Sequence, residues 1–454
     1  MVGFAPPSKP VTLTLFKSAV SDQIGTTSDR LQPRSTGLKN RMIYEADTKD
    51  DHAGRRSALI ERSGSVCLFL VLPFIAFVST RSATFMVALS MLLVIAAVLH
   101  SGRFAEFKIA LSGAVRSPMG KVLVLALALG VASTAWSPDP GRGLVTVLKM
   151  TGGLAVISTA CAAFRLVVPS RRLILLTIGV SAGSALCLIQ LHGGLSIRGL
   201  LNMQDHGSAI NRAVMTQALL VWPAAAFLVD RGRFVAAVLV VVFVTVTAST
   251  SESGASTLVM TIGIAAALVA YAWRRLVIAT SAGAVGVITL SAPWLARLAY
   301  ERLPGWFHDL LDESDSWERV VAWNDFTHAM SGKIWFGWGM GGSRVLPLPA
   351  PSDPSRTISD IWMHPHNALL QVWVEFGVVG AVISVVGLFL GIRCLASLPR
   401  PVFPFAIAAF SGAYSAAAIS HGAWQSWWLA LIGATVIAFG ILVTDMRARS
   451  ASPS

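Results

Sequence analysis

Charged residues are scarce in this sequence. Asp, Glu, Lys and Arg make up 13% of its 454 residues, whereas 54% of the residues are hydrophobic. A soluble domain usually carries about 25% charged residues, so the composition excludes an ordinary soluble protein. Length alone would suggest about three soluble domains. The apolar residues instead fall into blocks of roughly 17–25, the length of a helix that spans a bilayer, and this pattern predicts one membrane domain.

The marks of several other protein classes are also missing. The cysteines form no CxxC pair and lie in or beside apolar blocks, so neither a disulfide framework nor a zinc site is indicated. The histidines show no metal-ligand spacing, and we predict no metal and no cofactor. No basic stripe interleaved with aromatic residues accompanies the net charge of +13, which argues against nucleic-acid binding. The four cysteines are Cys67, Cys161, Cys187 and Cys394.

Residues 1–62 lack the apolar core of about 7–15 residues that a secretory signal requires. They hold ten Lys or Arg and seven Asp or Glu, with clusters of Pro and Ser/Thr. This composition is typical of a disordered tail. We therefore expect a tail at 1–62, a membrane domain at 63–445 and a second short tail at 446–454.

Twelve apolar blocks predict an all-α polytopic membrane protein with about 12 transmembrane helices. The blocks are Val66–Val78, Ala83–Leu99, Val122–Ala135, Leu144–Phe164, Leu173–Leu191, Ala213–Val229, Phe234–Ala248, Ser256–Ala272, Leu276–Leu295, Ala368–Leu390, Val402–Ile419 and Trp427–Val443. With the N-terminus inside, the inside loops and the C-terminal tail hold fifteen Lys or Arg, and the short outside loops hold four. Because Lys and Arg accumulate on the cytoplasmic side, both termini are predicted to be cytoplasmic.

One outside loop, residues 296–365, differs from the others. At about 70 residues it is too long, and too rich in tryptophan, to be only a connector. Apolar residues recur at helical spacing in Trp306–Asp312 and Ser316–Met330. We expect a helical cap on the outer face of the membrane, with Pro347–Pro354 irregular.

Three polar side chains at the outside ends of the spans are candidates for chemistry. His366 lies where the tenth span begins, and the positive end of a helix dipole favours a neutral imidazole that can act as a base. Asn367 is the expected N-cap. Arg212 and Arg319 could together bind a pyrophosphate, because guanidinium groups match phosphate oxygens in a bidentate way. The structural alternatives are an interfacial cap for His366, a snorkelling anchor for Arg212 and a solvated helix residue for Arg319.

Glycine patterns surround these candidates. Residues 337–342 match GxGxxG, but no strand precedes them, so we interpret them as a turn that lets backbones approach closely rather than as a dinucleotide site. Gly377 follows His366 by three helical turns, and with Ala381 it forms a small-residue pair that would let another helix pack closely. Glu375 is expected on the face of the tenth span opposite His366, where a buried acid needs a partner or water.

The motif around His366 resembles that of the O-antigen ligase and polysaccharide polymerase family. His366-Asn367, nine residues and then Gly377-Val-Val-Gly380 is similar to the H-N-x9-G-x-x-G pattern of O-antigen ligases. Ala381 and the following valine stand where the family often has two threonines.

Two further stretches resemble the same family. Asn211-Arg212 is similar to its first periplasmic arginine motif, and Ser316-Trp-Glu-Arg319 with Trp323 is similar to its second arginine region. The specific motifs occupy residues 200–225 and 316–380 of a similarity that covers roughly residues 66–445.

The resemblance implies a GT-C-like helical membrane enzyme that acts without a metal at the periplasmic face of the bacterial inner membrane. It would transfer a polyprenyl-pyrophosphate-linked glycan to an acceptor sugar hydroxyl, which for a ligase belongs to the lipid A core. Arg212 and Arg319 would hold the pyrophosphate, and His366 would take the proton from the acceptor hydroxyl. The supporting residues would be Asn211, Asn367, Gly377 and Gly380.

Other functions stay open at this point. A polymerase of O-antigen or exopolysaccharide repeats, acting on a growing polysaccharide, would use the same residues. A flippase of lipid-linked sugars would also fit twelve spans, but transporters place polar residues near the midplane of the membrane. The candidate residues here gather at one surface under a long loop, which favours surface chemistry.

Overall fold

The computed structural model describes residues 54–79, 82–193, 196–201, 207–306 and 316–451. Most of the predicted tail at 1–62 lies outside these ranges, and the chain is already helical from Gly54. At the other end the last helix continues to Ala451, through most of the predicted second tail.

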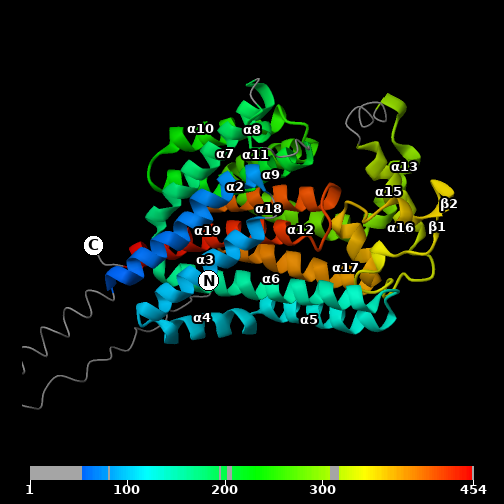
Figure 1. The fold of residues 1–454 in the computed structure, drawn as a ribbon, viewed down its shortest axis with the longest axis horizontal. Helices are drawn as coiled ribbons and strands as arrows, with labels where there is room; N and C mark the ends of the chain where they lie inside the picture. The colour runs from blue at the N-terminus through cyan, green and yellow to red at the C-terminus, as the bar shows by residue number, and fades with distance from the viewer. Residues whose placement is uncertain (1–53, 80–81, 194–195, 202–206, 307–315, 452–454) are drawn as a thin grey trace, which may run out of the picture. The chain divides into compact units, whose positions relative to one another are not determined.

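The described part of the chain is almost entirely helical (Figure 1). Its first half contains η1 (Val66–Val71), α2 (Leu72–Val78), α3 (Ser82–His100), α4 (Phe104–Arg116), α5 (Pro118–Ser133), η2 (Thr134–Trp136), α6 (Pro140–Val167), η3 (Ser170–Leu173), α7 (Ile174–His192), α8 (Ile197–Leu200) and α9 (Gly207–Asp230). Its second half contains α10 (Phe234–Ser249), α11 (Gly254–Ala272), α12 (Arg274–Leu290), α13 (Ala292–Arg302), α15 (Trp317–His328), η4 (Gly342–Arg344), β1 (Pro349–Ala350), β2 (Asp353–Thr357), α16 (Ile358–Ile361), α17 (Ala368–Leu395), α18 (Phe403–Ile419) and α19 (Ser426–Ala451).

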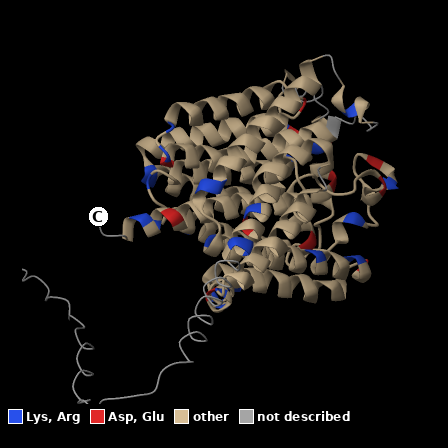
Figure 2. Cartoon of the chain, turned by 60° about the vertical axis from the view of Figure 1, so that its left-hand side comes forward, with Lys and Arg blue, Asp and Glu red and all other residues tan. Residues whose placement is uncertain are grey.

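Each of the twelve predicted apolar blocks is helical, which confirms an all-α polytopic membrane protein. Within the described residues, nine helices are long and apolar enough to cross a membrane. The bent pair α12 and α13 could supply a tenth, and the apolar helices α10 and α18 are shorter, at 16 and 17 residues. The count of twelve spans therefore remains a prediction. Figure 2 shows how sparse charged residues are along these helices.

The ninth predicted block, Leu276–Leu295, does not form one straight helix. α12 ends at Leu290 and the chain turns by 76° into α13. Pro293 lies in the first turn of α13, a position that tolerates proline, whereas the interior of a longer helix does not. The bend turns α13 toward α15 and α17, which it contacts.

α9 is the central helix of the membrane domain. Nearly all of its residues from Ala213 to Leu228 are buried, because α2, α7, α10, α11, α18 and α19 all contact it. A helix that is apolar on every side is stable only when it is surrounded in this way. Trp222 and Leu219 are among its fully buried side chains. The start of this fixed helix carries Asn211 and Arg212.

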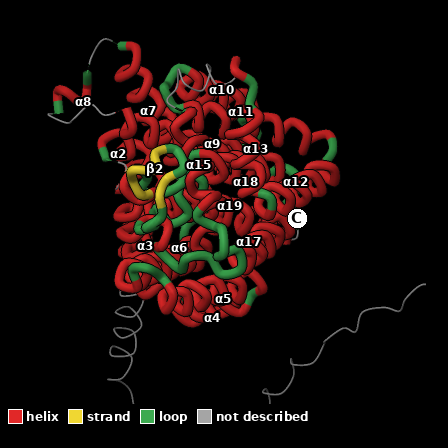
Figure 3. The backbone as a smooth tube through the Cα atoms, turned by 90° about the vertical axis from the view of Figure 1, so that its right-hand side faces the viewer, coloured by secondary structure: helices red, strands yellow, loops and turns green. Residues whose placement is uncertain are grey.

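The long loop forms the expected helical cap over one end of the helices (Figure 3). α15 lies within the predicted helix Ser316–Met330, whereas the predicted helix Trp306–Asp312 falls mostly outside the described residues. Pro347–Pro354 is not wholly irregular: β1 and β2 pair antiparallel there. Ser352 ties the hairpin to α15, because its backbone N–H and its hydroxyl both donate to the Asp325 carboxylate, at 3.0 and 2.5 Å.

α17 is broken at Gly377, which has φ 61° and ψ −152°. The straight helix that would align Gly377 beneath His366 does not exist, and that part of the sequence interpretation is wrong. The loop before the cap hairpin fills the break instead. Val378 donates its backbone N–H to the Ile334 carbonyl at 2.8 Å, and the Trp338 N–H donates to the Val374 carbonyl at 2.8 Å.

The GxGxxG segment is part of this insertion, as the interpretation of a turn required. Gly337, Gly339 and Gly341 all have positive φ values, between 61° and 82°. A side chain at Gly377 would overlap the backbone of Ile334 and Trp335. Glycine is therefore needed at the break because the backbone conformation and the close approach both exclude a Cβ atom.

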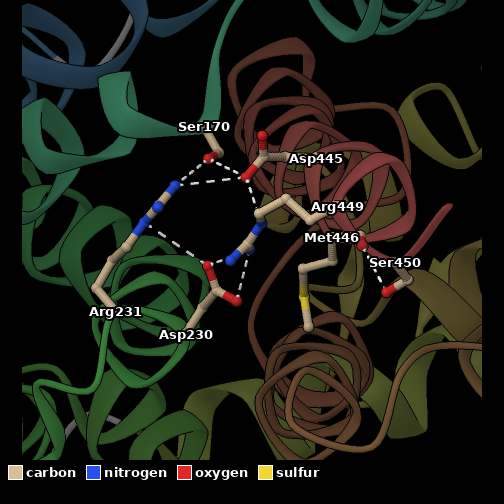
Figure 4. A network of polar contacts seen from close by, with 7 residues as sticks. All are labelled: Ser170, Asp230, Arg231, Asp445, Met446, Arg449 and Ser450. Atoms are coloured by element: carbon tan, nitrogen blue, oxygen red, sulfur yellow. Dashed lines mark hydrogen bonds and ion pairs between the residues drawn. The ribbon is translucent and has the colours of Figure 1, made fainter. Parts of the chain in front are cut away.

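The opposite end of the helices carries a network of paired charges (Figure 4). Arg449 of α19 pairs with Asp230 at the end of α9 at 2.6 Å, and Arg231 lies 3.4 Å from Asp445. The Ser170 hydroxyl donates to Asp445 at 2.6 Å. We call this cluster of Ser170, Asp230, Arg231, Asp445 and Arg449 the basic-end network. It joins α7, α9 and α19 through η3 and the helix ends.

Candidate functional site

A cavity of about 860 Å³ lies at the end of the helices that is covered by the cap. Helices α9, α11, α17 and α19 begin beside it, and α18 ends there. Asn211, Arg212, Arg319 and His366 all line this cavity, so the structure brings together the three candidate residues from three distant segments. The other lining residues are Met215, Glu252, Ser253, Gly254, Ala255, Leu258, Ala299, Leu303, Ser316, Val320, Trp323, Ile419, Ser420, His421, Gln425 and Trp427.

Arg212 reaches the cavity from the beginning of α9. Its side chain is half-buried, and its guanidinium carbon lies 5.8 Å from the centre of the Trp427 ring of α19. A guanidinium at this distance from an indole is attracted by the ring's negative face. The Trp427 ring therefore helps to hold the Arg212 guanidinium at the cavity wall.

Arg319 reaches the cavity from the first turn of α15 in the cap. It is half-buried, and no hydrogen bond or ion pair connects its side chain to any residue that the structure describes. Burial lowers the pKa of Arg319 from its ordinary value, but an arginine stays charged at neutral pH. An unpaired, partly desolvated guanidinium is well suited to bind an anion.

His366 sits in a strained backbone conformation just before α17. Its φ of 50° is the only positive φ of a non-glycine residue in the described ranges. Its backbone N–H donates to Nδ1 of His364 at 3.1 Å, and the two imidazole rings lie 4.1 Å apart. Asn367 is the N-cap of α17, as predicted, because its Oδ1 accepts the Leu370 N–H at 2.9 Å. The cap and the His364 contact together hold His366 at the cavity wall.

Burial, assisted by the nearby guanidinium charges, favours the neutral form of the cavity histidines. Burial lowers the pKa of His366, the charge of Arg319 lowers it further, and the Ser420 carbonyl raises it by a smaller amount. Burial lowers the pKa of His421 to about 3, with further lowering by Arg319 and Arg212. Burial and a neighbouring guanidinium, rather than the helix dipole expected from the sequence, are the larger causes of the lowered pKa of His366. A neutral imidazole can accept a proton.

His421 is a cavity residue that sequence reasoning did not select. It is 8% exposed, and its ring lies 4.5 Å from that of Trp428 and 5.1 Å from that of Trp427. It comes from the short loop between α18 and α19, 55 positions after His366 (421 minus 366). No local spacing could have linked the two histidines, because only the packing of α17 against α18 brings these loops together.

The buried Glu375 fixes the loop that carries His421. The sequence could not name its partners, and the structure supplies four donors. Its carboxylate accepts from the Gly341 N–H at 2.9 Å, Ser343 Oγ at 2.5 Å, Gln371 Nε2 at 3.0 Å and Trp424 Nε1 at 2.8 Å.

The same network reaches the backbone beside His421. Gln371 accepts the Ala423 N–H at 2.9 Å, so α17 holds both the inserted loop and the 420–425 loop. These buried hydrogen bonds position the walls of the cavity. Gly377 and Gly380 do not line the cavity; they support it through the backbone of α17.

Within the described residues, no group of three or more His, Cys, Asp or Glu side chains has the arrangement of a metal site. The chemical groups that the cavity offers are two guanidiniums, two imidazoles, one carboxylate from Glu252, and the polar side chains of serine, asparagine and glutamine. Such a set can bind an anion and move a proton between nearby oxygens.

Comparison with known proteins agrees with the motif resemblance. Residues 236–385 match the model of the O-antigen ligase family. This range includes Arg319 and His366, and Arg212 lies before it. A stretch of 116 residues is 24% identical to a proposed polysaccharide ligase of Rickettsia conorii. That alignment covers 24% of this chain and 28% of the length of the relative.

Proposed function

We propose that this chain is a membrane glycosyltransferase of the O-antigen ligase type. It would transfer a glycan from a polyprenyl pyrophosphate to a sugar hydroxyl of the lipid A core. The convergence of Arg212, Arg319 and His366 on one cavity carries this proposal. The family match of residues 236–385 supports it independently of the geometry.

The cavity suggests how the reaction would proceed. The acceptor oxygen attacks the anomeric carbon of the donor sugar, the bond from that carbon to the pyrophosphate oxygen breaks, and the leaving oxygen keeps the electron pair. His366 takes the proton of the acceptor hydroxyl as the new glycosidic bond forms. Arg212 and Arg319 stabilise the charge that develops on the leaving polyprenyl pyrophosphate.

The position of the cavity favours transfer over transport. It lies at one end of the helices, beneath the cap, rather than halfway along them, where transporters bind their substrates. A lipid-linked donor can keep its polyprenyl chain in the bilayer while its pyrophosphate enters the cavity. The basic-end network lies at the opposite end of α9 and α19. We therefore assign the basic end and both termini to the cytoplasm and the cavity to the periplasmic side of the inner membrane.

Surface polysaccharide from a deletion strain tests the proposal. A ligase deletion is expected to remove long glycan from lipid A while lipid-linked glycan chains of full length accumulate. Products with a single repeat would identify a polymerase instead, and glycan retained on the cytoplasmic side would identify a flippase. Complementation with the wild-type chain must restore the glycan, and transfer by the purified protein is expected to persist in excess EDTA.

A further inference from the structure

The cavity contains one carboxylate among its described lining residues, and the proposed reaction has not used it. Glu252 lies in the short turn between α10 and α11, opposite in charge to Arg212 and Arg319. Its side chain is exposed and makes no hydrogen bond or ion pair with any residue in the described ranges. In particular, no ion pair within 4.0 Å joins it to Arg319. Its charge is therefore available to a ligand.

Helix capping does not explain Glu252. Ser253 is the N-cap of α11, and its Oγ accepts the Ser256 N–H at 3.2 Å and lies 2.6 Å from Ser256 Oγ. Ser251 Oγ accepts the Ser253 N–H at 3.3 Å. The serines thus fix the backbone of this turn on both sides of Glu252. The backbone of the turn is held by these hydrogen bonds, whereas the Glu252 carboxylate itself makes none with the described residues. The carboxylate therefore faces the cavity without a protein partner there.

A carboxylate next to an anion-binding site has to serve a different part of the substrate. Glu252 and a pyrophosphate repel each other, so Glu252 cannot be a pyrophosphate ligand. Its two oxygens act only as hydrogen-bond acceptors when ionised. Neighbouring hydroxyl groups on a sugar ring are donors that match such a pair of acceptors. In a cavity of about 860 Å³ the sugar joined to the pyrophosphate must lie beside the arginines.

We propose that Glu252 binds hydroxyl groups of the sugar that is joined directly to the pyrophosphate. This inference rests on the proposed function and adds a substrate class to it. The donor carries free hydroxyls and no carboxylate on that sugar, because an acidic sugar would meet the charge of Glu252. Arg212 and Arg319 recognise the pyrophosphate, which all such lipid-linked donors share. Glu252 recognises the first sugar, which differs from one donor to another.

Binding of defined lipids to the purified full chain in nanodiscs tests this division. The probes are bare polyprenyl pyrophosphate and the same lipid bearing glucose, N-acetylglucosamine or glucuronic acid. Wild-type protein is expected to bind the glucose or N-acetylglucosamine lipid about tenfold more tightly than the bare lipid, since a hydrogen bond to a charged group contributes about tenfold in affinity. It should bind the glucuronic acid lipid more weakly than the two neutral ones, because the sugar carboxylate and Glu252 repel each other.

Glu252→Gln should change the two kinds of lipid in opposite directions. Loss of the negative charge should strengthen binding of the bare lipid by about twofold to threefold, as expected for partly screened like charges. The same change should weaken binding of the neutral glycosylated lipids several-fold. The difference in affinity between these lipids and the glucuronic acid lipid should therefore become smaller. Glu318→Gln is the matched control, because Glu318 is an exposed acid beside Arg319 that does not line the cavity. It should leave all four affinities unchanged.

The outcomes separate this inference from the proposed function. If the sugar adds no affinity in the wild-type protein, or if Glu252→Gln weakens the bare and glycosylated lipids equally, the role of Glu252 is wrong and the arginine site stands. If Arg212→Gln and Arg319→Gln also leave binding of the bare lipid unchanged, or if wild-type protein binds none of the lipids, both proposals fail. A monodisperse elution profile and an unchanged melting temperature of Glu252→Gln exclude misfolding as the cause.

Discussion

The two ends of this helical domain carry arginines in contrasting surroundings. At the basic end, Arg449 pairs with Asp230 at 2.6 Å and Arg172 with Glu61 at 3.1 Å. Arg274 donates to the carbonyls of Ala396 and Leu398 near the end of α17, at 3.0 and 2.8 Å. At the cavity end, Arg212 lies over an indole and Arg319 has no hydrogen bond or ion pair within the described residues.

Under the proposed function, this difference separates the structural arginines from the arginine that binds the pyrophosphate. At the basic end, carboxylates and carbonyls satisfy the guanidinium groups and join neighbouring helix ends. In the cavity, the Arg319 guanidinium is partly buried beside His366 and has no hydrogen bond or ion pair within the described residues. The amino-acid type is the same at both ends, so the partners of each side chain decide its role. The following predictions test this contrast.

The largest effect is expected at His366. His366→Ala removes the proposed base and should lower the rate of glycan transfer by about 10²–10⁴ while the protein stays in the membrane. The rate is measured with purified protein and a lipid-linked donor. His328→Ala is the control, because His328 lies in the same cap, bonds to the Asn324 carbonyl at 2.9 Å and does not line the cavity. Normal transfer by His366→Ala would exclude the base role.

Arg319→Lys should reduce transfer by at most about 10²–10³, the loss that follows complete removal of one hydrogen-bond donor to a developing anion. Lysine keeps the charge but cannot form the two parallel hydrogen bonds of a guanidinium. Arg297→Lys is the matched control, since Arg297 is exposed on α13 and pairs with Glu301 at 2.6 Å. Equal rates for Arg319→Lys and Arg297→Lys would mean that Arg319 is only a solvated residue of the cap.

The pH dependence of transfer should move when the charge of Arg319 is removed. His366 acts as a base when it is unprotonated, and its pKa lies below the usual 6.5. Wild-type activity should therefore hold at neutral pH and fall only at acid pH, below that lowered pKa. Arg319→Gln removes a cation that opposes protonation, so the pKa rises and the acid limb shifts to higher pH.

Arg212→Gln is the comparison for this shift. Arg212 is a cavity guanidinium that is not among the causes of the His366 pKa shift, so its removal should move the acid limb less. Rate profiles from about pH 5 to 8, the range in which histidine charge changes, measure both variants. An identical profile for wild type and Arg319→Gln would mean that the base is a group other than His366.

The smallest effect is expected at the basic end. Arg449→Ala should lower the free energy of unfolding by about 1 kcal/mol, because the arginine is 47% exposed and Arg231, 3.7 Å from the buried Asp230 carboxylate, remains as its partner. The rate of transfer per folded molecule should not change. Thermal unfolding in detergent and the transfer assay measure the two quantities. A large loss of transfer without loss of stability would remove the distinction between the two ends.

Arg212, Arg319 and His366 of the family motifs line one cavity, but the structural reason for each motif position differs in part from the one predicted. His366-Asn367 was selected for its place at a helix start, and Asn367 does cap α17. Gly377 was assigned to helix packing, although it breaks the helix and admits the backbone of Ile334. A pattern of residues can therefore mark a site while the backbone geometry beneath it stays invisible, because that geometry depends on a loop more than forty positions away (377 minus 334 is 43).

The sequence by itself determined the helices and their apolar surfaces, because hydropathy adds along the chain and needs no knowledge of neighbours. It also marked Arg212, Arg319 and His366 through local motifs. Tertiary structure alone decided that Glu252 and His421 join them at the cavity and that Glu375 has four donors. Those facts depend on contacts between segments far apart in the chain, and no short-range pattern encodes the free energy of such contacts.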